Sequence, residues 1–253
     1  MIIETIINSI PMTSFLVLLM NLENKMISQK TIKKEMKNFD KSFKSFKTKL
    51  EENFGIDEAQ KIIDQTRIEY EKLLPETPAF KGKVNVFNMV MKINVKNVAF
   101  YKAMKLNGKT VEETNRIFYD LAEEEFTGIP RPARFITRKV IFSRFWLWVT
   151  RRSAKNVYDH PDGWKVHYEK GDGKSSDWNF NREECGVIKY YKRHNVEELG
   201  HYCNYVDYLQ SKIFGLGMEN PKSLGRGDKV CIELFKQGRK TVEPNNLKGL
   251  IAH

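Results

Sequence analysis

The sequence contains few cysteines and none of the short motifs that define several common enzyme classes. Of its 253 residues, three are cysteine, and their spacing matches neither a zinc finger nor a Cys-x-x-Cys pair. Widely separated cysteines in odd number, in a chain of this size, argue against a secreted disulfide scaffold and favour reduced thiols in a cytoplasmic protein. The chain also lacks a P-loop, a Gly-x-Gly-x-x-Gly turn, His-Glu-x-x-His and Gly-x-Ser-x-Gly. The absence of these motifs means that nothing in the sequence indicates a nucleotide-binding enzyme, a zinc protease or a serine hydrolase.

A charge-free stretch near the N-terminus lacks the marks of a signal peptide or of a membrane span. Residues 5–22 carry no charged side chain, and the only earlier one is Glu4, whereas a signal peptide begins with positive charge. Pro11 and several polar residues interrupt the apolar character that a transmembrane helix requires. We interpret residues 1–26 as an apolar extension, with a membrane anchor as the alternative.

Acidic residues are outnumbered, which leaves a basic chain with a formal net charge of +11. Hydrophobic residues at 41% and aromatic residues at 12% indicate a folded globular protein. The charge is compatible with a nucleic-acid or anionic-surface partner, but lysines on solvated helix faces account for it without one. We therefore expect a small-molecule carboxylate as partner. Nucleic acid is not expected, nor is a membrane unless residues 1–25 are an anchor.

Helical periodicity dominates residues 27–158, which we interpret as a helical lobe. Apolar residues from Ile32 to Leu50 recur at spacings of three and four and predict an amphipathic helix that ends near Gly55. Binding of nucleic acid through the lysines of this helix is the least favoured function. Similar patterns predict four further helices, at residues 57–73, 84–106, 110–125 and 134–152. We expect the Phe and Trp side chains of the last of these helices to be core residues.

Alternating residues and turns replace the helical pattern in residues 159–253, which we interpret as an α+β lobe. The run DHPDG predicts the turn that separates the two lobes. Residues 164–170 alternate, and GDGKSS joins them to a strand from Trp178 as a hairpin, while residues 230–235 predict a third strand. The expected class is α+β, with an N-terminal helical lobe followed by a small antiparallel sheet packed with helices, together forming one compact domain.

The candidate site lies in the stretch that holds all three cysteines. Asn195 can cap a helix over residues 195–214, on which Cys203 and Asp207, four residues apart, share one face. Cys231 lies in the last predicted strand, on the same side as the glutamate two positions later. We therefore predict that one pocket between the sheet and this helix is lined by four residues: Cys185, Cys203, Asp207 and Cys231.

The same stretch resembles the L-2-amino-thiazoline-4-carboxylic acid hydrolase family. The resemblance rests on Cys185 before a short helix, on the run CNYVDY that starts at Cys203, and on Ser-Leu-x-x-Gly-x-x-x-Cys ending at Cys231. Two runs of the helical half, LPETPAFKG and AFYKAMKLNGKTVEE, are similar to that family as well. The family has Asp after the last cysteine, whereas this chain has Ile232, with Glu233 one position later.

The resemblance implies a hydrolase that acts on carbon–nitrogen bonds of cyclic amidines. Such an enzyme opens a thiazoline or related ring with water and yields an N-carbamoyl thiol amino acid. It implies Cys203 or Cys231 as nucleophile, Asp207 as acid and base, and Cys185 as a further wall of the pocket.

Substrate binding and cofactors are less constrained by the sequence. Arg226 and His201 are the candidate substrate-binding residues, since a basic side chain such as Arg226 can hold the substrate carboxylate. No cofactor is required, although thiolates with His201 or Asp207 could hold a divalent metal ion. Ile232 in place of the family's Asp motivates the alternative, a non-catalytic small-molecule or metal-binding protein of the same fold.

Overall fold

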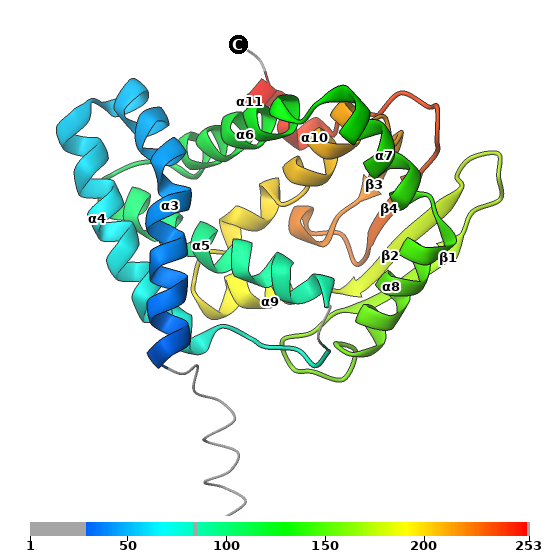
Figure 1. The fold of residues 1–253 in the computed structure, drawn as a ribbon, viewed down its shortest axis with the longest axis horizontal. Helices are drawn as coiled ribbons and strands as arrows, with labels where there is room; N and C mark the ends of the chain where they lie inside the picture. Colours follow the sequence, from blue (N-terminus) through cyan, green and yellow to red (C-terminus); the bar gives the residue numbers. More distant parts are fainter. Residues whose placement is uncertain (1–28, 83–84, 252–253) are drawn as a thin grey trace, which may run out of the picture.

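The chain folds as a helical half followed by a small antiparallel sheet packed with helices, which confirms the α+β class (Figure 1). The computed structural model describes residues 29–82 and 85–251, so the interpretation of residues 1–26 lies outside the described residues. The first half contains α3 (Gln29–Phe54), α4 (Ile56–Leu73), η1 (Leu74–Glu76), α5 (Val86–Leu106), α6 (Val111–Gly128), α7 (Arg131–Ile141) and α8 (Arg144–Lys155). The second half contains β1 (Lys165–Lys170), β2 (Trp178–Glu184), α9 (Gly186–Arg193), η2 (Glu197–Tyr202), α10 (Tyr205–Phe214), β3 (Met218–Lys222), η3 (Leu224–Arg226), β4 (Cys231–Phe235), η4 (Asn245–Leu247) and α11 (Lys248–Ile251).

The first four predicted helices are present as α3 to α6, and α5 lies at their centre. α5 packs against α4, α6, α8 and α9, and most of its C-terminal half is buried. The predicted stripe of α3 is confirmed, because Phe39 and Phe43 are buried and their ring centroids lie 3.9 Å apart. Among the residues described, none of the helices combines the length and apolar character that crossing a membrane requires.

The fifth predicted helix is two helices, and its aromatic side chains are largely exposed. A turn ends α7, and the Ser143 hydroxyl accepts a hydrogen bond from the backbone N–H of Trp146 at 3.2 Å, which caps α8. Phe135 is 52% exposed, Phe145 65% and Trp148 57%, so the prediction that these side chains are core residues is wrong. Periodicity identifies the side chains that share a helix face, but it does not say whether that face packs inward.

Four strands form one antiparallel sheet in the order β1-β2-β4-β3. The predicted hairpin of β1 and β2 is confirmed and places Tyr168 opposite Phe180. Between β2 and β4 the register places Arg182 opposite Cys231 and Phe180 opposite Glu233. Because side chains alternate along a strand, these five residues share one face of the sheet.

Two elements between the second and fourth strands differ from the prediction. The expected helix over residues 195–214 is divided into η2 and α10, and Asn195 has φ 55°, which is not the conformation of a helix N-cap. β3 lies between that helix and the last predicted strand, where no strand is predicted, and Pro221 is tolerated there because β3 is an edge strand.

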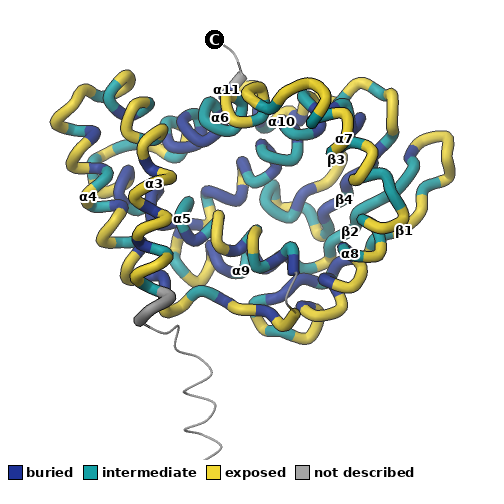
Figure 2. The backbone as a smooth tube through the Cα atoms, viewed as in Figure 1, coloured by how far each residue is buried: buried dark blue, intermediate teal, exposed yellow. Residues whose placement is uncertain are grey.

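The two halves share one hydrophobic core, and hydrogen bonds join them. A continuous cluster of buried apolar side chains extends from α3 and α5 to α9, α10 and the sheet. Figure 2 shows buried segments in α5, α9 and the strands. Tyr101 and Lys105 of α5 donate hydrogen bonds to the Glu198 carboxylate of η2 at 2.6 and 2.8 Å. The turn at residues 159–163 therefore connects two packed parts of one structure.

Candidate active site

The strand register places an arginine, a cysteine and a glutamate beside one another on the covered face of the sheet. Cys231 and Glu233 alternate with half-buried neighbours in β4 and are themselves buried. Arg182 is the register partner of Cys231, and its guanidinium forms an ion pair with Glu233. The guanidinium carbon also lies 4.2 Å from the ring centroid of Phe180, so an aromatic face supports the charged group.

Asp207 of α10 completes this group through a hydrogen bond with Glu233. Burial raises the pKa of Asp207, although the Arg182 guanidinium opposes the effect. Burial also raises the pKa of Glu233 to about 8; Arg182 opposes this shift and the Asp207 carboxylate adds to it. The pair therefore retains a proton near neutral pH, and two carboxyls that share a proton can serve as acid and base.

The three free cysteines lie within electrostatic range of the Arg182 guanidinium in this group. Burial raises the pKa of the Cys203 thiol to about 12, and Cys185 and Cys231 contribute to the rise. Burial raises the pKa of the Cys231 thiol to about 11, although the Arg182 guanidinium opposes the effect. Cys185, Cys203, Cys231 and Asp207 thus all lie within electrostatic range of Arg182, and their lining of one shared pocket stays a prediction. Cys203 and Cys231 are protonated at neutral pH, so either needs a base before it can act as a nucleophile.

Polar neighbours hold two of the thiols in place. Cys203 lies between η2 and α10, and its Sγ is 3.8 Å from the Ser223 hydroxyl. The Asn220 Nδ2 lies 3.8 Å from the Cys231 Sγ and donates to the backbone oxygen of Ile232 at 2.8 Å. Cys185 is the residue before α9 and is buried. Cys203 is half-buried, so the cluster is more open on its side than on that of Cys231.

The two predicted substrate-binding residues occupy different positions. Arg226 donates to the Oδ1 atoms of Asn220 and Asn246 at 3.0 and 3.3 Å and to the Asn220 backbone oxygen at 3.0 Å. Its guanidinium is therefore engaged in positioning Asn220 beside Cys231. His201 is exposed on η2, where its ring packs edge-on against Tyr202, and the structure does not bring it to the cysteines.

Three residues of the site are not predicted from the sequence: Arg182, Glu233 and Tyr168. Arg182 has one signal in the sequence, since it follows Trp178 and Phe180 at a spacing of two and so places a charge on the apolar side of its strand. Tyr168 stacks on Phe180 with centroids 4.5 Å apart. Burial raises the pKa of Tyr168, and Arg182 opposes the effect, so this hydroxyl lies within electrostatic range of the cluster.

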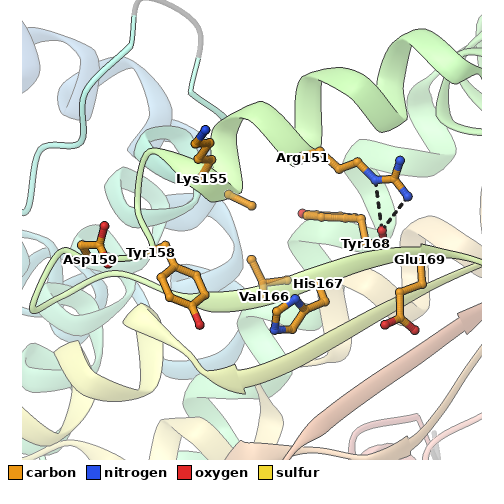
Figure 3. Close-up of a pocket in the computed structure, with 9 residues that line it drawn as sticks. Arg151, Lys155, Tyr158, Asp159, Val166, His167, Tyr168 and Glu169 are labelled. Carbon is orange, nitrogen blue, oxygen red and sulfur yellow. Dashed lines mark hydrogen bonds between the residues drawn. The ribbon is translucent and has the colours of Figure 1, made fainter.

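Tyr168 also lines an open groove of about 520 Å³ between α8 and β1 (Figure 3). Arg151 of α8 donates two hydrogen bonds to the Tyr168 backbone oxygen, at 2.9 and 3.1 Å. None of the four residues predicted to share a pocket lines this groove. As for metals, the described part of the chain shows no group of three or more His, Cys, Asp or Glu side chains arranged to hold an ion.

Comparison with known proteins gives no relative from which a role could be transferred. No family model matches the chain, and neither a curated protein nor a solved structure matches it.

Proposed function

We propose that the protein is a hydrolase that opens a thiazoline or related cyclic amidine ring at the cluster of Arg182, Asp207, Glu233 and the cysteines. The observation that carries the proposal is the hydrogen-bonded carboxyl pair of Asp207 and Glu233, of which Glu233 is ion-paired to Arg182 and lies beside the buried Cys231 thiol. Ring opening by acid and base catalysis requires a group that donates a proton and a group that accepts one, next to a nucleophile. Two carboxyls that share a proton beside a thiol meet this requirement. The sequence resemblance to the thiazoline hydrolases points to the same chemistry.

Cys231 is the better placed nucleophile. It is opposite Arg182 in the strand register and on the same strand face as Glu233, and the guanidinium stabilises its thiolate. A carboxylate of the pair takes the thiol proton as sulfur attacks the electrophilic carbon two of the ring. The Arg182 charge then favours the deprotonated forms of both thiol and carboxyl during the attack.

The balance of bonds specifies the product. The bond from the Cys231 sulfur to carbon two forms, the ring carbon–sulfur bond breaks, and the carboxyl pair returns the proton to the ring sulfur. Water then adds to the isothiourea formed on Cys231, and the bond to the enzyme sulfur breaks. The result is an N-carbamoyl thiol amino acid and the free Cys231 thiol. Cleavage of the ring carbon–nitrogen bond, which the sequence resemblance leads us to expect, would instead yield an S-carbamoyl product with a free amine. The N-carbamoyl product therefore requires cleavage of the ring carbon–sulfur bond.

The test combines purified protein with L-2-amino-thiazoline-4-carboxylic acid and measures thiol release with a chromogenic disulfide. We expect a free thiol and an N-carbamoyl product by mass spectrometry. Cys231→Ser and Glu233→Gln should each lower kcat by about a hundredfold or more. His201→Ala is the matched control and should retain the full rate, because His201 is exposed. The absence of ring opening, or a full rate when Cys203→Ser and Cys231→Ser are combined, would contradict the proposal.

A second candidate is a non-catalytic protein of the same fold that binds a small molecule or a metal ion. The raised pKa values of the Cys203 and Cys231 thiols favour its small-molecule form, because protonated buried thiols are inert, whereas metal binding would require thiolates. Elemental analysis of protein purified without chelator tests the metal form of this function. A metal ion in one-to-one ratio with the chain, together with no turnover, would support this candidate over the hydrolase.

A further inference from the structure

Helices α7 and α8 expose large apolar side chains. No residue of α7 is buried, and its exposed side chains include Phe135, Ile136 and Val140. Ile136 and Val140 are four residues apart and share a helix face, and Phe135 points about 100° away from Ile136. On α8 the exposed Phe145 and Trp148 lie one turn apart with ring centroids separated by 6.2 Å. Figure 2 shows exposed stretches along both helices. We refer to these five residues as the exposed apolar group.

The same two helices carry positive charge and no negative charge. Residues 129–156 contain no Asp or Glu and include eight basic residues: Arg131, Arg134, Arg138, Lys139, Arg144, Arg151, Arg152 and Lys155. In the part of the chain that the structure describes, none of the eight takes part in an ion pair. By contrast, Lys47 and Lys49 of the lysine-rich α3 both pair with glutamates. The charge on α7 and α8 is therefore left without an internal counterion.

The basic and apolar side chains are interleaved. The Lys139 ammonium lies 5.5 Å from the Phe135 ring centroid, and the Arg152 guanidinium carbon lies 5.7 Å from the Trp148 ring centroid. Aromatic rings flanked by cations suit the boundary between lipid headgroups and acyl chains, where rings enter the apolar layer and cations meet phosphate.

We propose that α7 and α8 form a docking surface for a membrane that contains anionic lipids, on which the exposed apolar group inserts between headgroups. Charge complementarity selects this partner: the uncompensated positive charge of both helices matches an anionic leaflet. A second copy of the chain would bring the same positive charges face to face. A nucleic acid would meet the cations but gain little from Ile136 and Val140, which cannot stack on bases.

Docking of this kind would also affect the candidate active site. Arg151 and Lys155 of α8 line the groove of Figure 3 together with Tyr168, whose hydroxyl lies within electrostatic range of the Arg182 cluster. A membrane on α8 would therefore lie beside that groove. The membrane proposal itself does not depend on the hydrolase activity.

Flotation of the full chain with vesicles tests the proposal. We expect binding to phosphatidylcholine vesicles that contain phosphatidylserine, weaker binding at high salt, and little binding to phosphatidylcholine alone. Phe135→Ser combined with Phe145→Ser should weaken binding about tenfold or more, since both rings lose their contact with lipid. Lys139→Glu combined with Arg152→Glu should weaken it about twentyfold or more, since each cation near an anionic surface contributes about fivefold. All four positions are exposed, so folding should be retained, and circular dichroism checks it.

The matched control is Lys37→Glu combined with Lys41→Glu on α3, which removes the same charge from another exposed helix face and should leave binding near the wild-type level. Trp148 supplies a second readout, because its fluorescence should shift to the blue with anionic vesicles and be quenched by brominated acyl chains. Equal vesicle binding by the wild type and both α7–α8 variants would overturn the proposal. So would a dimer that the Phe135→Ser and Phe145→Ser variant abolishes, or retention on RNA that depends only on the charges.

Discussion

At the scale of single residues, the carboxyl pair predicts an unusual dependence of stability on pH. Because the folded pKa of Glu233 is raised to about 8, the folded protein holds a proton that the unfolded chain has lost above its ordinary pKa of 4.5. The contribution to stability is complete below about 4.5 and is lost as pH rises to about 8, with a slope of at most about 1.4 kcal/mol per pH unit. Urea unfolding at several pH values should show this decline, and Glu233→Gln should flatten it.

Glu198 provides a control of opposite sign. Although burial opposes the shift, hydrogen bonds from Lys105 and Tyr101 lower the pKa of Glu198. Its contribution to stability is therefore present above its ordinary pKa and is lost as pH falls through the lowered value. Glu198→Gln should leave the decline between pH 4.5 and 8 in place. The same decline in Glu233→Gln as in the wild type would show that another group causes it.

The site could be predicted from the sequence only in part. Alternation in the last strand places Cys231 and Glu233 on one face, and the structure has them so. The role of Arg182 could not be predicted, because its position opposite Cys231 depends on the register between two strands that are distant in sequence. Arg226 is the opposite case, a residue that the sequence suggests for the site and the structure does not support. Its charge suggests that it binds a ligand, but in the fold its guanidinium is hydrogen-bonded to Asn220 and Asn246.

At the scale of elements, the close crossing of η2 and η3 determines the surroundings of Cys203. A Cβ atom at Gly225 would lie 1.9 Å from the Gly200 backbone oxygen and 2.9 Å from the Cys203 Sγ. Gly225→Ala should therefore displace η3 and lower the free energy of unfolding by about 3 kcal/mol. Gly128→Ala is the control, because a Cβ at this helix position meets nothing within 4 Å and should be neutral or stabilising. Equal unfolding midpoints for the two variants would contradict the claim that η2 and η3 leave no room for a side chain at Gly225.

The capping box of α6 gives a second prediction for an element. Thr110 Oγ1 accepts from the Glu113 N–H at 3.1 Å, and the Glu113 carboxylate accepts from the Thr110 N–H at 2.7 Å. Thr110→Ala should lower the free energy of unfolding by about 1 kcal/mol. Thr127→Ala near the end of α6 should cost less, because its hydroxyl bonds only to carbonyls of the preceding turn. Thermal unfolding of both variants distinguishes capping from a general effect of losing a threonine.

The boundaries of helices and strands can be predicted from the sequence where residues of a single turn determine them. They cannot be predicted where contacts between distant segments determine them. The helix predicted at residues 110–125 is present, and all atoms of its capping box of Thr110 and Glu113 belong to one helical turn. Asn195 is predicted to cap a helix, but Glu198, three residues later, accepts hydrogen bonds from α5. The aromatic face of α7 and α8 is exposed because those helices lie at the edge of the fold, which periodicity does not specify.

At the scale of the whole molecule, the shared core predicts that both halves unfold together. All four tryptophans lie between residues 146 and 178, whereas α3 to α6 supply much of the helical signal. Tryptophan fluorescence and circular dichroism at helical wavelengths should therefore report a single transition with one midpoint.

The variant Tyr101→Phe removes the 2.6 Å hydrogen bond to Glu198 while keeping the buried ring. It should lower the free energy of unfolding by about 1 kcal/mol and shift the midpoints of both probes equally. Tyr158→Phe should change neither, because Tyr158 is exposed and its hydroxyl makes no hydrogen bond within the described residues. Two separate transitions, or a Tyr101→Phe effect on one probe alone, would mean that the halves are independent folding units.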